Sequence, residues 1–270
     1  MILRLATNIV ILLAFVGFSP CVYYAYADSL AAASAFGETL TVRELLERGV
    51  RPDETDEEGY TPLLRVAFAG NSRPLSAHVG IMNLLIEAGA NVNATVYVLP
   101  LHDENPIRTM SALHRTVAGG TEFLELTRLL LAGGANPNLP SAWGRPLHIA
   151  AASARASAGE IELLLEWGAD ARALNQWGVD PLVEAVIALN PSLEKIALLL
   201  EAGANVHALF DWNGHRGLSV LMAAAMNGTS DIVELLLYNG ASRHLESEDG
   251  LNARDYAINA GRTDNAFLLW

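Results

Sequence analysis

The chain has 270 residues, 51% of them hydrophobic and 17% charged, so it has enough apolar material for a sizeable core and is not a disordered chain. Acidic residues outnumber basic ones by 30 to 17, and the resulting net charge of −13 excludes nucleic acid as a partner because it repels phosphate backbones. The single cysteine excludes an internal disulfide and the common cysteine-rich zinc sites.

Residues 1–27 have the pattern of a secretory signal peptide. Arg4 precedes an apolar run from residue 5 to residue 18, and Ala25 and Ala27 form an A-x-A exit. We therefore expect cleavage between Ala27 and Asp28 and export of residues 28–270 to the periplasm. The exported chain would contain no cysteine, which suits an oxidising compartment.

Two alternatives to cleavage remain for the same segment. Apolar character persists to residue 27, so the segment could stay uncut as a membrane anchor. Cys21 could carry a lipid, as in bacterial lipoproteins, although Pro20 stands where that motif has Gly or Ala. The N-terminal residue of the purified protein distinguishes these outcomes.

The rest of the chain repeats two phrases. The first is a Leu-rich stretch that closes on a glycine, at positions 49, 89, 134, 168, 203 and 240, spaced 40, 45, 34, 35 and 37 residues apart. The second opens each repeat with a capping residue before apolar residues, as in Thr61-Pro62-Leu63. The pattern predicts two helices per repeat, the second ending at a glycine with left-handed backbone, followed by a turn rich in Asn and Asp.

Together these phrases resemble the ankyrin repeat family, whose opening is T-P-L-H-x-A and whose period is about 33 residues. The resemblance rests on Thr61-Pro62-Leu63, on Pro146-Leu147-His148-Ile149-Ala150-Ala151 and on the L-L-L-E-x-G-A closings. It implies an all-α solenoid of about seven helix-turn-helix repeats with projecting β-hairpin fingers and degenerate terminal repeats as caps. It also implies that His114 and His148 hydrogen-bond the backbone of neighbouring fingers. The expected repeats are residues 30–58, 59–108, 109–142, 143–177, 178–216, 217–249 and 250–270.

Departures from the regular period mark the individual features of this chain. Residues 71–80 are expected to enlarge a turn between two helices, and residues 94–108 to lengthen the following finger. Further additions fall at residues 152–158, 189–192 and 207–217. In repeat proteins such insertions map to loops, which are often part of a binding face.

The sequence contains no pattern typical of catalysis. It has no G-x-S-x-G elbow, no P-loop and no dinucleotide fingerprint. His102-Asp103-Glu104 is the one cluster that resembles a metal set, but adjacent loop residues rarely converge on one ion. We therefore predict no enzymatic activity, metal, cofactor or small-molecule substrate.

The predicted partner-binding residues are mainly aromatic, apolar or acidic. Trp143 and Trp177 fall at finger tips just before a glycine, and Trp and Tyr are enriched among binding hot spots. Trp270, in contrast, is expected to pack in the core of the last repeat. Finger positions and inner-helix positions together give the set Glu57, Glu58, Tyr60, Phe68, Tyr97, Trp143, Trp177, Ile187, Trp212 and Met226. For each aromatic residue the alternative is that it folds back over its own finger.

These features predict an exported bacterial ankyrin repeat protein that binds another protein without catalysing a reaction. The acidic residues would steer a basic partner towards it. The favoured role is neutralisation of a toxic enzyme, with assistance to a periplasmic enzyme as a second role. The alternative is a membrane-anchored envelope scaffold that keeps its N-terminal segment.

Overall fold

The computed structural model describes residues 29–69, 75–97 and 109–270, and it divides into an N-terminal unit that ends at Tyr97 and a C-terminal unit that begins at Val98. The predicted cleavage site at Ala27 and Asp28 lies outside the described residues, as does the cluster at residues 102–104. Within the described residues, no helix combines the length and apolar character that a membrane span requires.

In its described part the N-terminal unit contains two helix pairs and one strand. Its elements are α3 (Leu30–Phe36), α4 (Thr39–Glu47), α5 (Pro62–Phe68), α6 (Leu75–Glu87) and β1 (Thr95–Tyr97). Residues 75–80 therefore belong to helix α6, and the prediction that all of residues 71–80 enlarge a turn is wrong for them. An apolar stretch containing Leu75, Val79 and Ile81 extends this helix instead, and Ile81 is fully buried.

The C-terminal unit contains five helix pairs in the residues described. Its elements are β2 (Thr109–Ser111), α7 (Ala112–Gly119), a 3₁₀ turn η2 (Thr121–Phe123), α8 (Leu124–Ala132), α9 (Pro146–Ala152), α10 (Ala158–Glu166), α11 (Pro181–Ile187), α12 (Leu193–Glu201), β3 (Leu209–Trp212), β4 (His215–Ser219), α13 (Val220–Asn227), α14 (Ser230–Tyr238), α15 (Ala253–Asn259) and α16 (Thr263–Leu268). Strands β3 and β4 form an antiparallel hairpin with an irregularity between Phe210 and Trp212.

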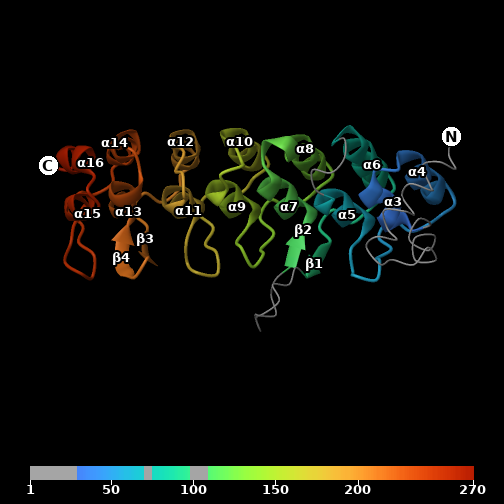
Figure 1. The fold of residues 1–270 in the computed structure, drawn as a ribbon, viewed down its shortest axis with the longest axis horizontal. Coiled ribbons are helices and arrows are strands. Elements are labelled where there is room, and N and C mark those ends of the chain that lie inside the picture. The colour runs from blue at the N-terminus through green and yellow to red at the C-terminus, as the bar shows by residue number, and fades with distance from the viewer. Residues whose placement is uncertain (1–28, 70–74, 98–108) are drawn as a thin grey trace, which may run out of the picture. The chain divides into compact units, whose positions relative to one another are not determined.

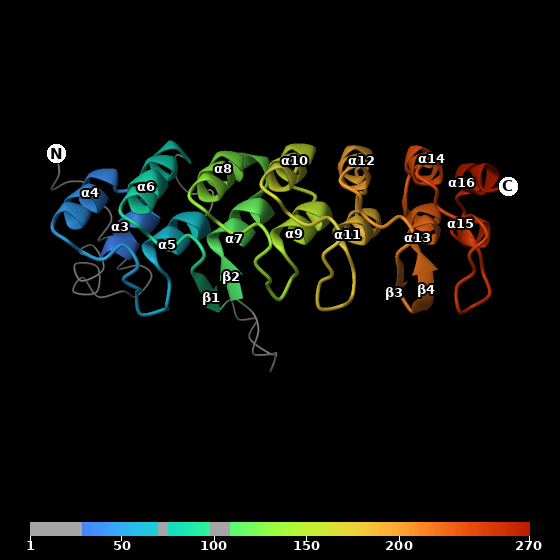
Figure 2. The same ribbon diagram turned by 180° about the vertical axis from the view of Figure 1, so that it is seen from behind.

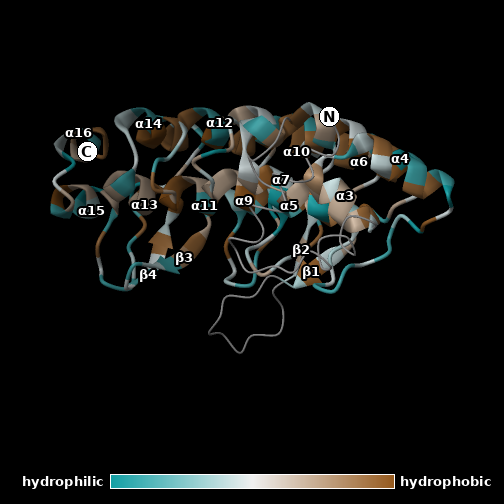
Figure 3. Cartoon of the chain, turned by 45° about the vertical axis from the view of Figure 1, so that its right-hand side comes forward, coloured by the Kyte–Doolittle hydropathy of each residue, from teal (hydrophilic) through white to brown (hydrophobic). Residues whose placement is uncertain are grey.

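The helices of the C-terminal unit form two rows. The first helices of the pairs, α7, α9, α11, α13 and α15, lie side by side, and the second helices form a parallel outer row (Figures 1 and 2). Apolar residues gather on the helices, and the connecting finger loops are more hydrophilic (Figure 3). The core between the rows is made of leucines that are almost fully buried, among them Leu130, Leu147, Leu164, Leu182 and Leu221.

The helix ends follow the predicted chemistry. The side chains of Thr61 and Asp180 accept hydrogen bonds from backbone N–H groups three residues later, at 3.3 and 2.9 Å, and Pro62 and Pro181 occupy the first helical position. The six closing glycines of the Leu-rich phrase all have positive φ, between 82° and 92°. Helices α4, α6, α8, α10, α12 and α14 therefore end as the sequence indicates.

His114 and His148 connect successive fingers, which confirms the role that the family resemblance implies. His114 Nε2 lies 3.0 Å from the Leu139 carbonyl oxygen, and His148 Nε2 lies 3.1 Å from that of Val179. On the other side of each ring, Nδ1 accepts from the backbone N–H of Ser111 or Arg145 at 3.3 Å. This bonding assigns the neutral tautomer protonated at Nε2, because only a protonated Nε2 donates to a carbonyl.

Side chains from elsewhere in the stack cap the C-termini of three inner helices. Lys195 of α12 donates from Nζ to the carbonyl oxygens of Ala150, in the last turn of α9, and of Ser153, its C-cap, at 2.8 and 2.7 Å. Amide groups play the same part for α11 and α13, where Asn227 and Asn265 each donate to two carbonyl oxygens. These bonds satisfy carbonyl groups that have no partner within their own helix.

Candidate functional site

Two concave surfaces of the C-terminal unit meet at a pair of tryptophans. A cleft of about 340 Å³ lies between the finger tips and is lined by Pro140, Ser141, Ala142, Trp143, Gly144, Arg145, Leu174, Asn175, Gln176 and Trp177. A groove of about 450 Å³ runs along the inner helices and is lined by Met110, Ala118, Trp143, His148, Ile149, Ala152, Ser153, Trp177 and Glu184. Trp143 and Trp177 line both surfaces. We call these two surfaces the finger-tip cleft and the inner groove.

The turn that carries Trp143 is held by one serine. Ser141 Oγ accepts a hydrogen bond from the Trp143 backbone N–H at 3.2 Å and donates to the Gly144 carbonyl at 2.5 Å. Gly144 has φ +93°, and a Cβ at this position would lie 2.8 Å from Cβ of His148. The close approach of the turn to the His148 ring therefore requires glycine. Trp143 is 37% exposed beside it.

The turn that carries Trp177 is held by one asparagine. Asn175 Oδ1 accepts from the backbone N–H groups of Trp177 and Val179, at 2.9 and 3.0 Å. The Asn175 amide also donates to Glu184 Oε1 at 2.9 Å, which links the turn to helix α11. Trp177 is 64% exposed. Between the two finger tips, the Gln176 amide donates to the Ala142 carbonyl, so the two turns are joined directly.

The charges near the tryptophans are unevenly divided between the two surfaces. Arg145 lines the finger-tip cleft and donates to the Asn138 carbonyl at 3.1 Å. Glu184 lines the inner groove. Burial raises the pKa of its carboxyl group, and the hydrogen bond from Asn175 acts in the opposite direction. Burial also raises the pKa of the nearby Asp180, the N-cap of α11. The inner groove is thus apolar with one half-buried acid in its lining.

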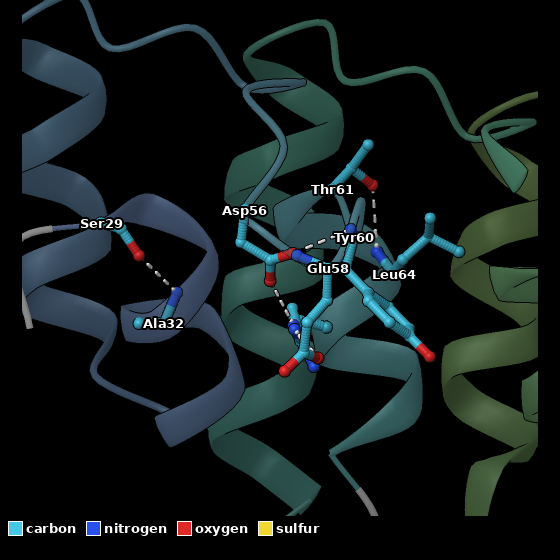
Figure 4. A network of polar contacts seen from close by, with 8 residues as sticks. Ser29, Ala32, Asp56, Glu58, Tyr60, Thr61 and Leu64 are labelled. Atoms are coloured by element: carbon cyan, nitrogen blue, oxygen red, sulfur yellow. Dashed lines mark hydrogen bonds and ion pairs between the residues drawn. The ribbon is translucent and has the colours of Figure 1, made fainter. Parts of the chain in front are cut away.

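Other predicted binding residues form a separate cluster in the N-terminal unit. Arg65 donates from Nε to Asp56 Oδ2 at 2.5 Å and from Nη2 to Glu58 Oε2 at 2.6 Å, and its guanidinium lies 4.1 Å from the Tyr60 ring centroid. Figure 4 shows Asp56, Glu58 and Tyr60 together in this network. Tyr60 also meets Phe68 edge to face, with ring centroids 5.4 Å apart.

The remaining predicted residues lie apart from both clusters. Glu57 is exposed at its finger tip, and Tyr97 is 67% exposed on strand β1. Ile187 and Met226 are half-buried on α11 and α13, and Trp212 is half-buried on strand β3. Within the C-terminal unit, the structure brings only Trp143 and Trp177 of the predicted set together around one described surface.

Trp270 does not pack in the core, and that prediction is wrong. Its side chain is 75% exposed, and the Arg254 guanidinium lies 3.6 Å from its ring centroid. Arg243 donates from Nη1 to its backbone carbonyl at 2.5 Å. The core of the last helix pair is filled instead by Tyr256 and Ala257 of α15.

The sequence analysis does not predict several residues of the site. Glu184, Asn175, Leu174 and Ile149 line the two surfaces but have no distinctive motif of their own. One feature of the sequence, the alignment of two repeats, identifies Glu184 and Asn175. Residues 56–65 and 175–184 occupy the same places in their repeats, so Asp56 and Arg65 correspond to Asn175 and Glu184. In the described part of the chain, no group of three or more His, Cys, Asp or Glu residues is arranged to hold a metal ion.

The fold and site define a repeat protein of stacked helix pairs whose finger tips and inner helices form recessed surfaces. Models of ankyrin repeats match residues 30–77 and 188–270. The crystal structure of the human ASB11 ankyrin repeat domain is similar, with a TM-score of 0.65 and 22% identity, covering 89% of this chain and 97% of that one. The chain is therefore an ankyrin repeat protein.

One curated relative resembles part of the chain. Cyclin-dependent kinase inhibitor 2A of Monodelphis domestica is 30% identical over 121 residues, which are 44% of this chain. The match spans 58% of that protein's own length.

Proposed function

We propose that this chain is a non-catalytic protein-binding module that uses the finger-tip cleft and the inner groove of its C-terminal unit. The observation that carries this proposal is the placement of Trp143 and Trp177, which line both surfaces from adjacent finger tips. Exposed tryptophans beside an apolar groove are the residues that most often supply binding energy in protein interfaces. The match to ankyrin repeats supports the same general function, which is binding of another protein.

The surface is ordered by its own hydrogen bonds before any partner arrives. Ser141 and Asn175 fix the two turns, and Gln176 joins them. A partner that docks here would therefore order few groups on this side of the interface. Since ordering of side chains and loops opposes association, a pre-ordered surface favours tight binding.

The partner we propose is a protein with a basic surface, and the favoured role is inhibition of an enzyme. The net charge of −13 supports a basic partner because opposite charges accelerate encounter. The name of the Monodelphis relative, an inhibitor of a cyclin-dependent kinase, supports inhibition as a role for such a surface. Assistance to a neighbouring enzyme is the second role that the same surface would serve.

We further propose that the protein acts in the periplasm after cleavage before Asp28. The A-x-A exit at Ala25 and Ala27 supports this location. An envelope scaffold that retains residues 1–27 is the alternative. Sequencing the N-terminus of protein purified from its source separates the two, since the exported form begins at Asp28 and the scaffold at Met1.

The test is capture of a partner by the full chain, immobilised through a C-terminal tag, from periplasmic and secreted proteins of the source organism. We expect a stoichiometric partner whose affinity falls at least about 30-fold on combined Trp143→Ala and Trp177→Ala substitution, since hot-spot residues contribute about 2 kcal/mol or more. The matched control combines Trp167→Ala and Tyr238→Ala, two exposed aromatic residues at the C-terminal ends of outer helices α10 and α14. The proposal would be overturned if the control variant lost partner binding and the Trp143→Ala, Trp177→Ala variant retained it.

A further inference from the structure

The repeat that carries Arg65 and the repeat that carries Glu184 share one turn geometry. Asp56 Oδ1 accepts from the N–H groups of Glu58 and Tyr60, at 3.0 and 2.9 Å. Asn175 Oδ1 accepts from the N–H groups two and four residues later in the same way, at 2.9 and 3.0 Å. Backbone bonds from Asp56 N–H to Tyr60 and from Asn175 N–H to Val179 also match, at 3.0 and 2.9 Å.

In the first of these repeats the turn encloses a guanidinium from its own helix. Arg65 reaches from α5 to the carboxylates of Asp56 and Glu58 and to the face of Tyr60. The space between the inner helix and the finger turn is therefore suited to a planar cation, held by ion pairs and by an aromatic ring.

In the second repeat an acid replaces the cation, uncharged side chains replace the two carboxylates, and Val179 replaces Tyr60. Glu184 stands where Arg65 stood, Asn175 replaces Asp56, and Trp177 replaces Glu58. The Glu184 carboxylate accepts from the neutral Asn175 amide, and no Lys or Arg nitrogen among residues 29–69, 75–97 and 109–270 lies within 4.0 Å of it. A carboxylate in this position lacks the opposite charge that the first repeat contains.

A further arginine at the corresponding position in another repeat also has an aromatic partner of its own. The Arg115 guanidinium of α7 lies 5.3 Å from the ring centroid of Phe123. At this position of the inner helix an arginine is thus stacked on an aromatic side chain in both the α5 and α7 repeats. Arg145, the cation closest along the chain to Trp143, lines the finger-tip cleft and bonds Asn138. The lining of the inner groove contains the Glu184 carboxyl group, the His148 imidazole that bonds Val179 and, among the described residues, no Lys or Arg.

We propose that the inner groove binds an arginine side chain of the partner protein, with the guanidinium between the Glu184 carboxylate and the indole rings of Trp143 and Trp177. This inference rests on the proposed protein-binding function and specifies the chemistry of its partner. A guanidinium stacks on indole and pairs with a carboxylate through its planar fork, whereas an ammonium group is a compact and strongly hydrated charge. The groove of about 450 Å³ lies within the size range of pockets that enclose small ligands.

The experiment compares two acetylated and amidated pentapeptides, Ala-Leu-Arg-Leu-Ala and the same sequence with citrulline in place of arginine. Citrulline has nearly the shape of arginine but no charge. Binding to the full chain is followed by fluorine NMR of fluorotryptophan, with the five tryptophan signals assigned by single substitutions. We expect the arginine peptide to shift the Trp143 and Trp177 signals and to bind about tenfold more tightly than the citrulline peptide.

Two variants test whether the charge of Glu184 causes the preference for arginine. Glu184→Gln keeps an acceptor for Asn175 and removes the charge, and we expect it to abolish the preference for arginine over citrulline. Glu234→Gln removes the same charge from the exposed face of α14 and is expected to preserve that preference. Equal binding of both peptides, preserved selectivity in Glu184→Gln, or no shift of either tryptophan at millimolar peptide would each overturn the arginine assignment.

The two proposals fail separately. If the captured partner depends on Trp143 and Trp177 but binds Glu184→Gln as tightly as the unaltered chain, the protein-binding function stands and the arginine assignment falls. If the partner depends on none of the three residues, the finger-tip and groove location is itself wrong.

Discussion

Replacement of Lys195 by Met is expected to lower the free energy of unfolding by about 3 kcal/mol, a large effect for one side chain in an ankyrin repeat protein. Lys195 is almost fully buried, and its ammonium group donates to the carbonyl oxygens of Ala150 and Ser153. Methionine fills a similar volume but leaves both carbonyls without a donor. Buried acceptors that lose their partner carry a desolvation penalty.

The buried acid Glu160 adds to this effect. Burial lowers the pKa of Lys195, and the negative charge of Glu160 acts in the opposite direction. Glu160 Oε2 accepts from the backbone N–H and the hydroxyl of Ser157, at 2.8 and 2.5 Å, while Oε1 is buried without a hydrogen-bond partner among the described residues. Without Lys195, this buried carboxyl group would lose its nearby positive charge.

Urea unfolding of the full chain measures the change. Lys195→Met with Glu160→Gln is expected to cost less than the sum of the two single substitutions, because removing both charges leaves no isolated one. Arg128→Met, at an exposed position of helix α8 in the same outer row, is the control for loss of a cation. A Lys195→Met protein as stable as the unaltered chain would show that the cap contributes nothing.

The second large effect is an acid-dependent loss of stability that originates at His114. Burial lowers the pKa of His114 to about 4, against an ordinary value of 6.5, while hydrogen bonds to backbone oppose this shift. Between these values the unfolded chain binds a proton that the folded chain excludes. Stability is therefore fully present above about pH 6.5 and declines as the pH falls.

The expected loss at this site is about 2 kcal/mol between pH 7 and pH 5, and about 3 kcal/mol by pH 4. Its cause is the burial of the imidazole ring, which in the folded chain is the neutral tautomer that accepts from Ser111 at Nδ1 and donates to Leu139 from Nε2. Protonation at Nδ1 would remove that acceptor and place a charge in a buried site. Burial also lowers the pKa of His148, so this histidine of the next repeat adds a loss of the same sign.

The measurement is the free energy of unfolding of His114→Gln and of the unaltered chain at several pH values between 7 and 5. The variant is expected to be less stable at pH 7 but to lose less stability on acidification, so the two curves converge. His207→Gln, at an exposed position before the hairpin, is the control and should follow the unaltered chain. Parallel curves for His114→Gln and the unaltered chain would contradict the assignment.

Local sequence signals predict most of the fold because each repeat is stabilised by short-range chemistry. Thr61 and Asp180 cap their helices, the closing glycines have positive φ, and His114 and His148 bond the next finger. Trp270 shows where this approach fails. The sequence is compatible with an aromatic residue in the core or with an exposed ring against Arg254 at this position. The structure shows that Tyr256 already occupies the core, so the Trp270 ring is exposed.

The site is less predictable than the fold because it is made by neighbouring repeats. Trp143 and Trp177 were found one at a time from their finger positions, but their common cleft depends on the bond between Gln176 and Ala142. The cap formed by Lys195 likewise joins residues 45 apart. Glu184 has no distinctive motif of its own. Its role becomes apparent only by comparison with Arg65, which occupies the same position in another repeat and pairs with Asp56 and Glu58.

Hydrogen exchange of the isolated chain and of its complex with the captured partner tests the central claim most directly. We expect the partner to slow exchange in residues 140–145 and 174–179 and along α9 and α11. The outer helices α10, α12 and α14 should exchange at the same rates in both states. Protection confined to those outer helices, with the two tryptophan turns unchanged, would contradict the assignment of the binding surface.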